Sequence, residues 1–205
     1  MQIERIVNNY VNEFNEKLDI NLKPIIKEDS CYRYPVYCNC AENTIIVWEE
    51  LFEALTEEQK YKHVLYALAI LYTAEFYGKE TMIDGHKVRE LPFNPNIIAE
   101  EVFKKVGLSF SPFEELQKEI YETKQKLYPY PDSRGSFFRN GDVLCRKGIS
   151  RLVVKNIFAE DGVVMVQAQS VNSIDNTSIT KTITCPEVEM LSMYRIGEAV
   201  EFKNN

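Results

Sequence analysis

The side chains best suited to chemistry are few in this sequence of 205 residues, and they are scattered. Its thiols and imidazoles belong to seven residues: Cys31, Cys38, Cys40, Cys145, Cys185, His63 and His86. The spacing Cys31-x6-Cys38-x-Cys40 comes nearest to a zinc motif, because thiolates bind zinc well. Structural zinc sites usually hold four ligands in closely spaced pairs, however, and a fourth ligand here would have to come from a distant part of the chain. We therefore expect no metal and no cofactor, and we interpret the cysteines as small packed thiols.

Catalysis by a cysteine would need a histidine base close in space and a lowered thiol pKa. His63 falls one turn into a predicted helix whose next residues are apolar, and His86 lies in the polar turn Asp84-Gly85-His86-Lys87, so neither is tied to a cysteine by spacing. Carboxylate pairs are common, but most fall in the first turns of predicted helices, where the helix dipole favours negative charge. No Gly-Lys-Ser/Thr phosphate loop occurs. The sequence assigns no catalytic residue and favours a function other than catalysis.

Acidic residues gather in the first two thirds of the chain. Residues 1–130 contain 22 Asp and Glu against 15 Lys and Arg, whereas residues 131–205 contain nine of each, so the first part carries the whole net charge of −7. Six glutamates fall within 17 positions that include no basic residue: Glu42, Glu49, Glu50, Glu53, Glu57 and Glu58. If they share a face, that face would dock on a basic surface of another protein, such as the nucleic-acid channel of an enzyme. The alternative is a merely solvated face.

One basic stretch occurs in the last third of the chain, and it contains two aromatic residues: Arg134, Phe137, Phe138, Arg139, Arg146, Lys147 and Arg151. Basic residues interleaved with aromatics are typical of surfaces that contact single-stranded nucleic acid or an acidic partner. The alternative, which we favour, is that the two phenylalanines pack in the interior. Direct nucleic-acid binding by the first part of the chain is disfavoured, because its negative charge repels phosphate.

The elements that must position these groups change character once along the chain. Apolar residues three and four positions apart predict a helix over residues 3–18, and a capping box, Thr56-Glu57-Glu58-Gln59, begins a helix over about 57–77 that is apolar on nearly all sides. A buried strand is expected at 44–48, and further helices at 95–106 and 113–127 begin at Asn-Pro and Ser-Pro pairs. Residues 128–135, with two prolines, cannot continue a helix.

After that segment the hydrophobic period becomes two. Strands are expected at 142–146, 151–158, 163–171, 177–184 and 199–202, with a hairpin turn at 159–162. Five short antiparallel strands suit a small barrel, because closure removes exposed edges. The predicted fold class is α+β, in three parts: an acidic, mainly helical domain with a short β element (1–127), a Pro/Tyr linker (128–135) and a small antiparallel β-barrel (136–205).

Two resemblances accompany this division. Asn140-Gly141-Asp142 ahead of a strand resembles the opening of an SH3-like barrel, a fold that serves many functions. The order of elements in residues 1–110 resembles that of SprT-like zinc metallopeptidases, including a Gly107-Leu108 pair that ends an amphipathic helix. In that family the buried helix carries His-Glu-x-x-His, and a third histidine precedes the Gly-Leu pair. The corresponding positions here are Tyr66, Ala67, Ile70 and Pro95, none of which can bind zinc or accept a proton in that role.

These features predict a non-enzymatic binding or inhibitory protein that acts by protein–protein contact through an acidic helical surface. Its size and character suit a phage or mobile-element inhibitor of a nucleic-acid-handling host enzyme. Two alternatives stay open: a hydrolase or degenerate zincin with a Cys/His site, and a nucleic-acid-binding adaptor that uses the basic stretch. The start, MQIERIVNNY, lacks the apolar core of a signal peptide, and the longest apolar stretch, 64–71, is far shorter than the ~20 residues of a membrane span. We expect a cytoplasmic protein with reduced thiols and no contact with a membrane.

Overall fold

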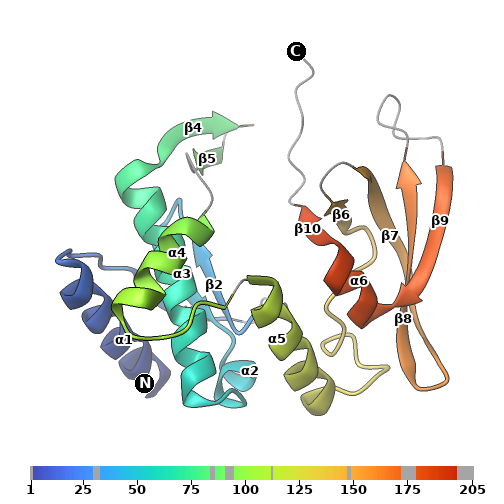
Figure 1. Ribbon diagram of the computed structural model, residues 1–205, viewed down its shortest axis with the longest axis horizontal. Coiled ribbons are helices and arrows are strands. Elements are labelled where there is room, and N and C mark those ends of the chain that lie inside the picture. Colours follow the sequence, from blue (N-terminus) through green and yellow to red (C-terminus); the bar gives the residue numbers. More distant parts are fainter. Residues whose placement is uncertain are drawn as a thin grey trace. The chain divides into compact units, whose positions relative to one another are not determined.

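The chain is an α+β protein, as the sequence predicted, and it separates into two compact units, residues 1–116 and 117–205. The computed structural model in Figure 1 describes residues 2–29, 33–83, 86–90, 95–111, 113–146, 149–171 and 179–197. The division falls inside helix α5 (Phe113–Leu127), ahead of the segment 128–135 that the sequence predicts to be a linker.

The first unit surrounds one long helix with shorter elements. In chain order these are α1 (Gln2–Leu18), β1 (Ile25–Glu28), β2 (Val36–Asn39), β3 (Thr44–Val47), α2 (Glu49–Glu53), α3 (Glu57–Tyr77), β4 (Lys79–Ile83), β5 (His86–Glu90) and α4 (Pro95–Lys105). Strand β3 is the centre of a three-stranded sheet and pairs in parallel with β1 and antiparallel with β2. Strands β4 and β5 form a separate antiparallel pair, so His86 begins a strand and does not lie in a turn as the sequence suggested.

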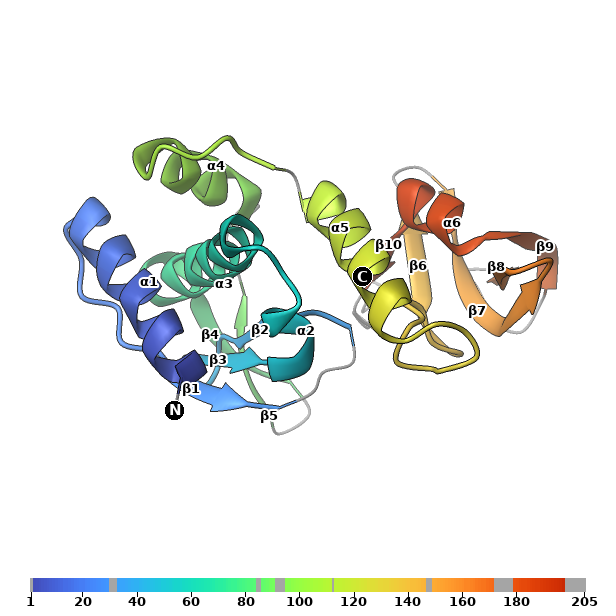
Figure 2. The same cartoon turned by 90° about the horizontal axis from the view of Figure 1, so that it is seen from below.

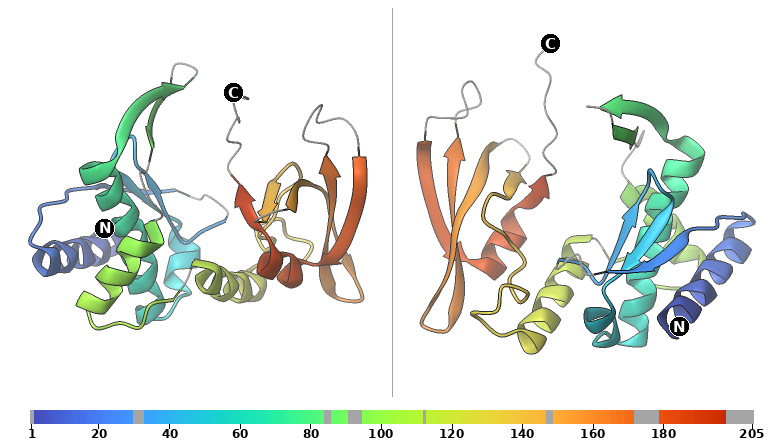
Figure 3. Two further views of the ribbon diagram at one scale, coloured as in Figure 1. Left: turned by 45° about the horizontal axis from the view of Figure 1, so that its top comes forward. Right: turned by 180° about the vertical axis from the view of Figure 1, so that it is seen from behind.

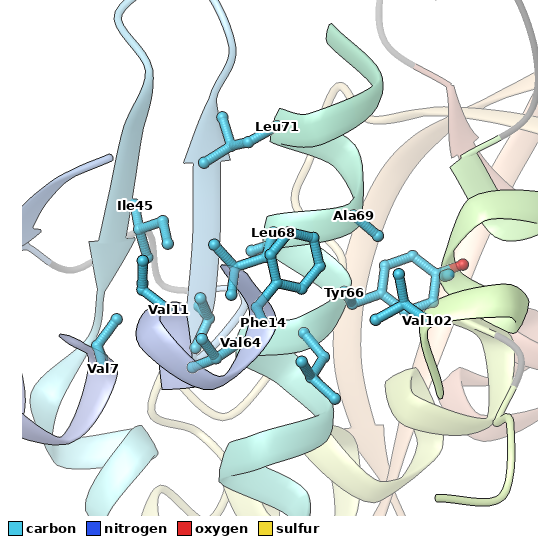
Figure 4. Close-up of a cluster of buried hydrophobic side chains, with 14 of the residues drawn as sticks. Val7, Val11, Phe14, Ile45, Val64, Tyr66, Leu68, Ala69, Leu71 and Val102 are labelled. Atoms are coloured by element: carbon cyan, nitrogen blue, oxygen red, sulfur yellow. The ribbon is translucent and has the colours of Figure 1, made fainter. Parts of the chain in front are cut away.

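Helix α3 is the core of this unit because nearly every side of it is covered. The predicted capping box is confirmed: the Thr56 hydroxyl accepts from the Gln59 N–H at 3.3 Å, and the Gln59 side chain accepts from the Thr56 N–H at 3.0 Å. Figure 4 shows Phe14 of α1 and Ile45 of β3 among the side chains around Leu68 of α3. Each such side chain, fully buried, contributes roughly 1.5–3 kcal/mol of hydrophobic stabilisation.

The second unit is an antiparallel sheet with one short helix. Its elements after α5 are β6 (Val143–Arg146), β7 (Ile149–Glu160), β8 (Val163–Val171), β9 (Ile179–Pro186), α6 (Glu187–Met193) and β10 (Arg195–Gly197). The strand order is β10-β6-β7-β8-β9. Asp161 and Gly162 both have positive φ, as a tight Asp-Gly hairpin turn requires, which confirms the predicted turn between β7 and β8. The strand predicted at 199–202 lies outside the described residues, and the SH3-like barrel stays a prediction.

The segment 128–135 is held against the end of α5 within this unit. Tyr128 is buried, and the Arg134 guanidinium lies 4.4 Å from the centroid of its ring while pairing with Asp132 at 2.7 Å. The Gln125 side chain donates to the Gly135 carbonyl oxygen at 2.7 Å.

Among the described residues, no helix combines the length and the apolar composition needed to cross a membrane.

Candidate functional site

Five of the six predicted site glutamates occur on two consecutive helices. Glu49, Glu50 and Glu53 belong to α2, and Glu57 and Glu58 form the first turn of α3; we call these five the α2–α3 acidic surface. All five side chains are exposed. Figure 2 shows α2 directly after β3, where that strand ends.

Glu42 is separated from this surface. It lies in the turn between β2 and β3, ahead of β3, whereas α2 follows that strand. An extended strand advances about 3.3 Å per residue, so Glu42 and Glu49 are on the order of 15–20 Å apart. Glu42 pairs instead with Lys27 at 3.2 Å. Glu42 therefore lies apart from the five glutamates of α2 and α3, and a single face for all five stays a prediction.

Helix α2 is fixed by the side chains on its inner side. Leu51 and Phe52 are fully buried, and the flanking Trp48 and Leu55 are buried as well. Glu49 and Glu53 are one helical turn apart, so they lie on the same side of the helix. Trp48 supplies no side-chain cap, and the two glutamates in the first turn instead interact favourably with the helix dipole.

Two lysines lie beneath the acidic surface. Lys60 pairs with Glu57 at 2.7 Å and Lys62 pairs with Glu58 at 2.8 Å, yet the lysine side chains are only 12% and 10% exposed, against 76% and 61% for the glutamates. The Lys60 ammonium also lies 5.8 Å from the centroid of the Phe52 ring. The hydrogen bond from Lys60 lowers the pKa of Glu57. The surface thus keeps more negative than positive charge, with its cations on the inside.

The predicted basic stretch does not form one surface in the described residues. Phe137 and Phe138 are fully buried, with ring centroids 5.6 Å apart in an edge-to-face arrangement, so neither ring is open to a ligand. Arg134 is engaged with Tyr128 and Asp132. Arg139 is half-buried beside a turn and Arg151 is exposed on β7. The Arg146 side chain and Lys147 lie outside the described residues.

Glu187 is a buried charged residue that the sequence analysis missed. Its Oε1 atom accepts hydrogen bonds from the Ser136 hydroxyl at 2.7 Å and from the backbone N–H groups of Phe137 and Phe138 at 2.8 and 3.0 Å. Lys124, equally buried, donates to the Ser136 carbonyl oxygen at 2.9 Å. Burial raises the pKa of Glu187, and the hydrogen bonds oppose that rise. This network holds the segment after α5 to the start of α6.

The thiols and imidazoles show no catalytic or metal-binding arrangement within the described residues. His63 is buried, and burial, with a smaller effect from the Lys62 charge, lowers its pKa to about 4. Cys38 and Cys40 are half-buried and pack against the core of the first unit. No group of three His, Cys, Asp or Glu side chains in the described part of the chain could hold a metal ion. Cys31 and the side chain of His86 lie outside that part.

The three positions of α3 that correspond to the His-Glu-x-x-His motif of SprT-like peptidases are occupied by packing side chains. Tyr66 is buried and meets Phe103 of α4 edge to face, with centroids 6.4 Å apart, while Ala67 is buried and Ile70 packs against the same core. Searches against family models, curated proteins and solved structures find no match to this chain.

Proposed function

We propose that this protein is a non-enzymatic binding protein that docks its α2–α3 acidic surface on a basic surface of another protein. The observation that carries the proposal is the exposure of five carboxylates on two consecutive helices. The first of these helices, α2, is anchored by the buried side chains of Leu51 and Phe52. A charged surface on an anchored element loses little conformational freedom when it binds, so less of the interaction energy is spent on ordering it.

The distribution of charge between the two units supports this role. Residues 1–116 contain 20 Asp and Glu against 12 Lys and Arg, a net charge of −8, whereas residues 117–205 contain 11 against 12, a net charge of +1. A strongly negative unit is attracted to a basic partner over distances of about a Debye length, roughly 8–10 Å at physiological salt. A nucleic-acid-handling enzyme presents such a surface in its channel, and docking there would inhibit it. An inhibitor from a phage or mobile element fits this proposal.

The test begins with the partner. Capture from a lysate of the native host on the immobilised protein, followed by mass spectrometry, names candidates, and titration with each purified candidate measures its dissociation constant. The double variant Glu49→Lys, Glu53→Lys is expected to weaken binding by at least about tenfold, or ~1.4 kcal/mol. Most of that loss is expected in the association rate, and the wild-type affinity is expected to fall as salt is raised.

A matched control separates local from global charge effects. The variant Glu16→Lys, Glu100→Lys changes the net charge by the same amount at two exposed positions of α1 and α4. It is expected to bind nearly as well as the wild type. Equal losses in both double variants, or no loss in the α2 variant while it stays folded, would contradict docking through this surface.

A further inference from the structure

The sheet of the second unit has two unlike faces. Side chains alternate between the faces along each strand, and positions such as Val154, Val166 and Ala168 are buried. Helix α6 packs against β8 and β9 and buries Met190 and Leu191 there. The alternate positions of β7, β8 and β9 are exposed or half-buried and form what we call the open face. Figure 3 shows these strands from two further sides.

Strand register places the open-face residues in rows. Phe158 of β7 lies opposite Met165 of β8, and both side chains are half-buried. In the next row, Asn156 lies opposite Gln167, which lies opposite Thr184 of β9. One row further on, Val153 of β7 lies opposite Gln169, which lies opposite Thr182. An apolar row with an aromatic ring therefore adjoins two uncharged rows, which contain amide and hydroxyl groups and one valine.

Carboxylates are nearly absent from this sheet, although the chain as a whole is acidic. On β7 the open face carries two basic residues, Arg151 and Lys155, against a single acidic one, Glu160, and β8 contains no charged residue. Glu160 pairs with Val163 at the tip of the β7–β8 hairpin, beyond the apolar row. Arg151 and Lys155 are exposed, and Lys155 lies at an irregularity in the pairing of β7 with β8. Phosphate groups would meet cations on this face and few repelling charges.

These groups match the chemistry of an unpaired nucleotide. A half-exposed phenylalanine can stack on a base, amides and hydroxyls can hydrogen-bond base edges, and lysine and arginine neutralise the backbone. We infer that the open face of this sheet binds single-stranded nucleic acid, with Phe158 as the stacking residue and Arg151 and Lys155 as backbone contacts. Duplex binding is disfavoured because the bases must be unstacked to reach Phe158.

This site is independent of the acidic surface of the proposed function, which lies in the other unit. It also differs from the basic stretch of the sequence analysis, because Phe137 and Phe138 are buried and only Arg151 is common to both. Either surface can therefore fail its test without affecting the other.

The test uses fluorescence anisotropy of the full chain with labelled oligonucleotides of about 15 thymidines or 15 uridines, a length close to the upper site size of one OB-fold domain. Wild-type protein is expected to bind at low salt, and the preferred probe identifies DNA or RNA. Phe158→Leu, which keeps an apolar side chain but removes the ring, is expected to weaken binding by about tenfold. Arg151→Glu with Lys155→Glu is expected to weaken binding by tenfold or more. It is also expected to reduce the slope of the logarithm of the binding constant against the logarithm of the salt concentration by about two.

Lys118→Glu with Lys126→Glu is the matched control, since it makes the same charge change at two exposed positions on α5 of the same unit. It is expected to bind within about twofold of the wild type, because these lysines belong to α5 and not to the sheet. Three results would overturn the inference: no wild-type binding to either probe at low salt, equal losses in both charge variants, or unchanged affinity in Phe158→Leu. The last result would indicate adhesion to any polyanion. Circular dichroism confirms that each variant is folded.

Discussion

The buried carboxyl of Glu187 allows the sharpest test of the physical picture, because charge and hydrogen bonding can be changed separately there. Glu187→Ala removes the oxygen that accepts hydrogen bonds from the N–H groups of Phe137 and Phe138 and leaves a cavity. Each buried donor left without a partner costs about 1–3 kcal/mol, and loss of the side-chain volume adds to that. The Lys124 ammonium also loses its attraction to this buried carboxyl. We expect a loss of at least about 3 kcal/mol in the free energy of unfolding of the second unit.

Glu187→Gln keeps the acceptor oxygen and removes the charge. Burial is the largest influence on this carboxyl and raises its pKa, so the ionised form is disfavoured in the folded chain. The amide resembles the protonated acid, so the glutamine variant does not bury an ionised carboxylate. In exchange, its hydrogen bonds are weaker and it loses the attraction to the Lys124 ammonium. We expect this variant to lie within about 1 kcal/mol of the wild type at neutral pH, far above the alanine variant.

The stability of the wild type is expected to depend on pH through Glu187. Because the folded pKa is raised above the unfolded value, the contribution of Glu187 to stability is fully present below the unfolded pKa and is lost as pH rises through the folded pKa. Wild type should therefore lose stability relative to Glu187→Gln as the pH rises above about 4.5 and through the raised pKa, by about 1.4 kcal/mol for each pH unit that separates the two pKa values.

Hydrogen exchange of β7 and β8 in urea, read by mass spectrometry, measures the second unit. Fluorescence of Trp48, the single tryptophan, follows the first unit and serves as the internal control. Equal losses of stability in the glutamine and alanine variants would contradict this role of the hydrogen bonds to Glu187. A gain in the stability of wild type over Glu187→Gln as the pH rises would contradict a raised pKa of Glu187.

Three further predictions concern single residues. His63 has a folded pKa lowered to about 4, so its stabilising contribution is present above pH 6.5 and is lost on acidification toward pH 4. The loss is about 3 kcal/mol in the free energy of unfolding of the first unit. The urea midpoint followed by Trp48 fluorescence should therefore fall on acidification in the wild type, and His63→Phe should remove this part of the fall. Thr56→Ala breaks the capping box and should cost the first unit about 1 kcal/mol in the same assay, whereas a loss below a few tenths would show that the cap is dispensable. A Cβ atom at Gly135 would collide with the Tyr128 carbonyl oxygen, so Gly135→Ala should raise hydrogen exchange in the end of α5, and unchanged exchange there would contradict the packing described for residues 128–135.

Elements whose signal is local were predictable from the sequence, and those that depend on distant partners were not. Helix α3 has a capping box and many successive apolar positions, and β7 and β8 alternate regularly around an Asp-Gly turn. Helix α2 has only five residues, too few to show a period, and it is fixed by Leu51 and Phe52 packing into a core built mainly by other elements. Strand β1 pairs in parallel with β3 across 19 positions, which no local pattern reveals.

The same distinction applies to the charged residues. Glutamates 49 to 58 are close in sequence and lie on consecutive helices, so their proximity was predictable, whereas Glu42 is separated from them by the length of β3. Glu187 follows Pro186 at the start of a helix, where an exposed glutamate is the ordinary expectation. Its burial depends on Ser136, 51 positions earlier in the chain, and so could not be inferred from its neighbours.

The positions of the lysines divide the acidic surface into two parts with different expected roles in binding. Glu57 and Glu58 are paired with lysines whose own side chains are nearly buried, so a partner that binds these carboxylates must compete with cations already in place. No such lysine pairs with Glu49 or Glu53 in the described part of the chain, and their charge is available to a partner without that competition. Steering of a basic partner is therefore expected to depend mainly on α2, while the first turn of α3 contributes shape and a fixed position. For this reason the charge-reversal test is placed on Glu49 and Glu53.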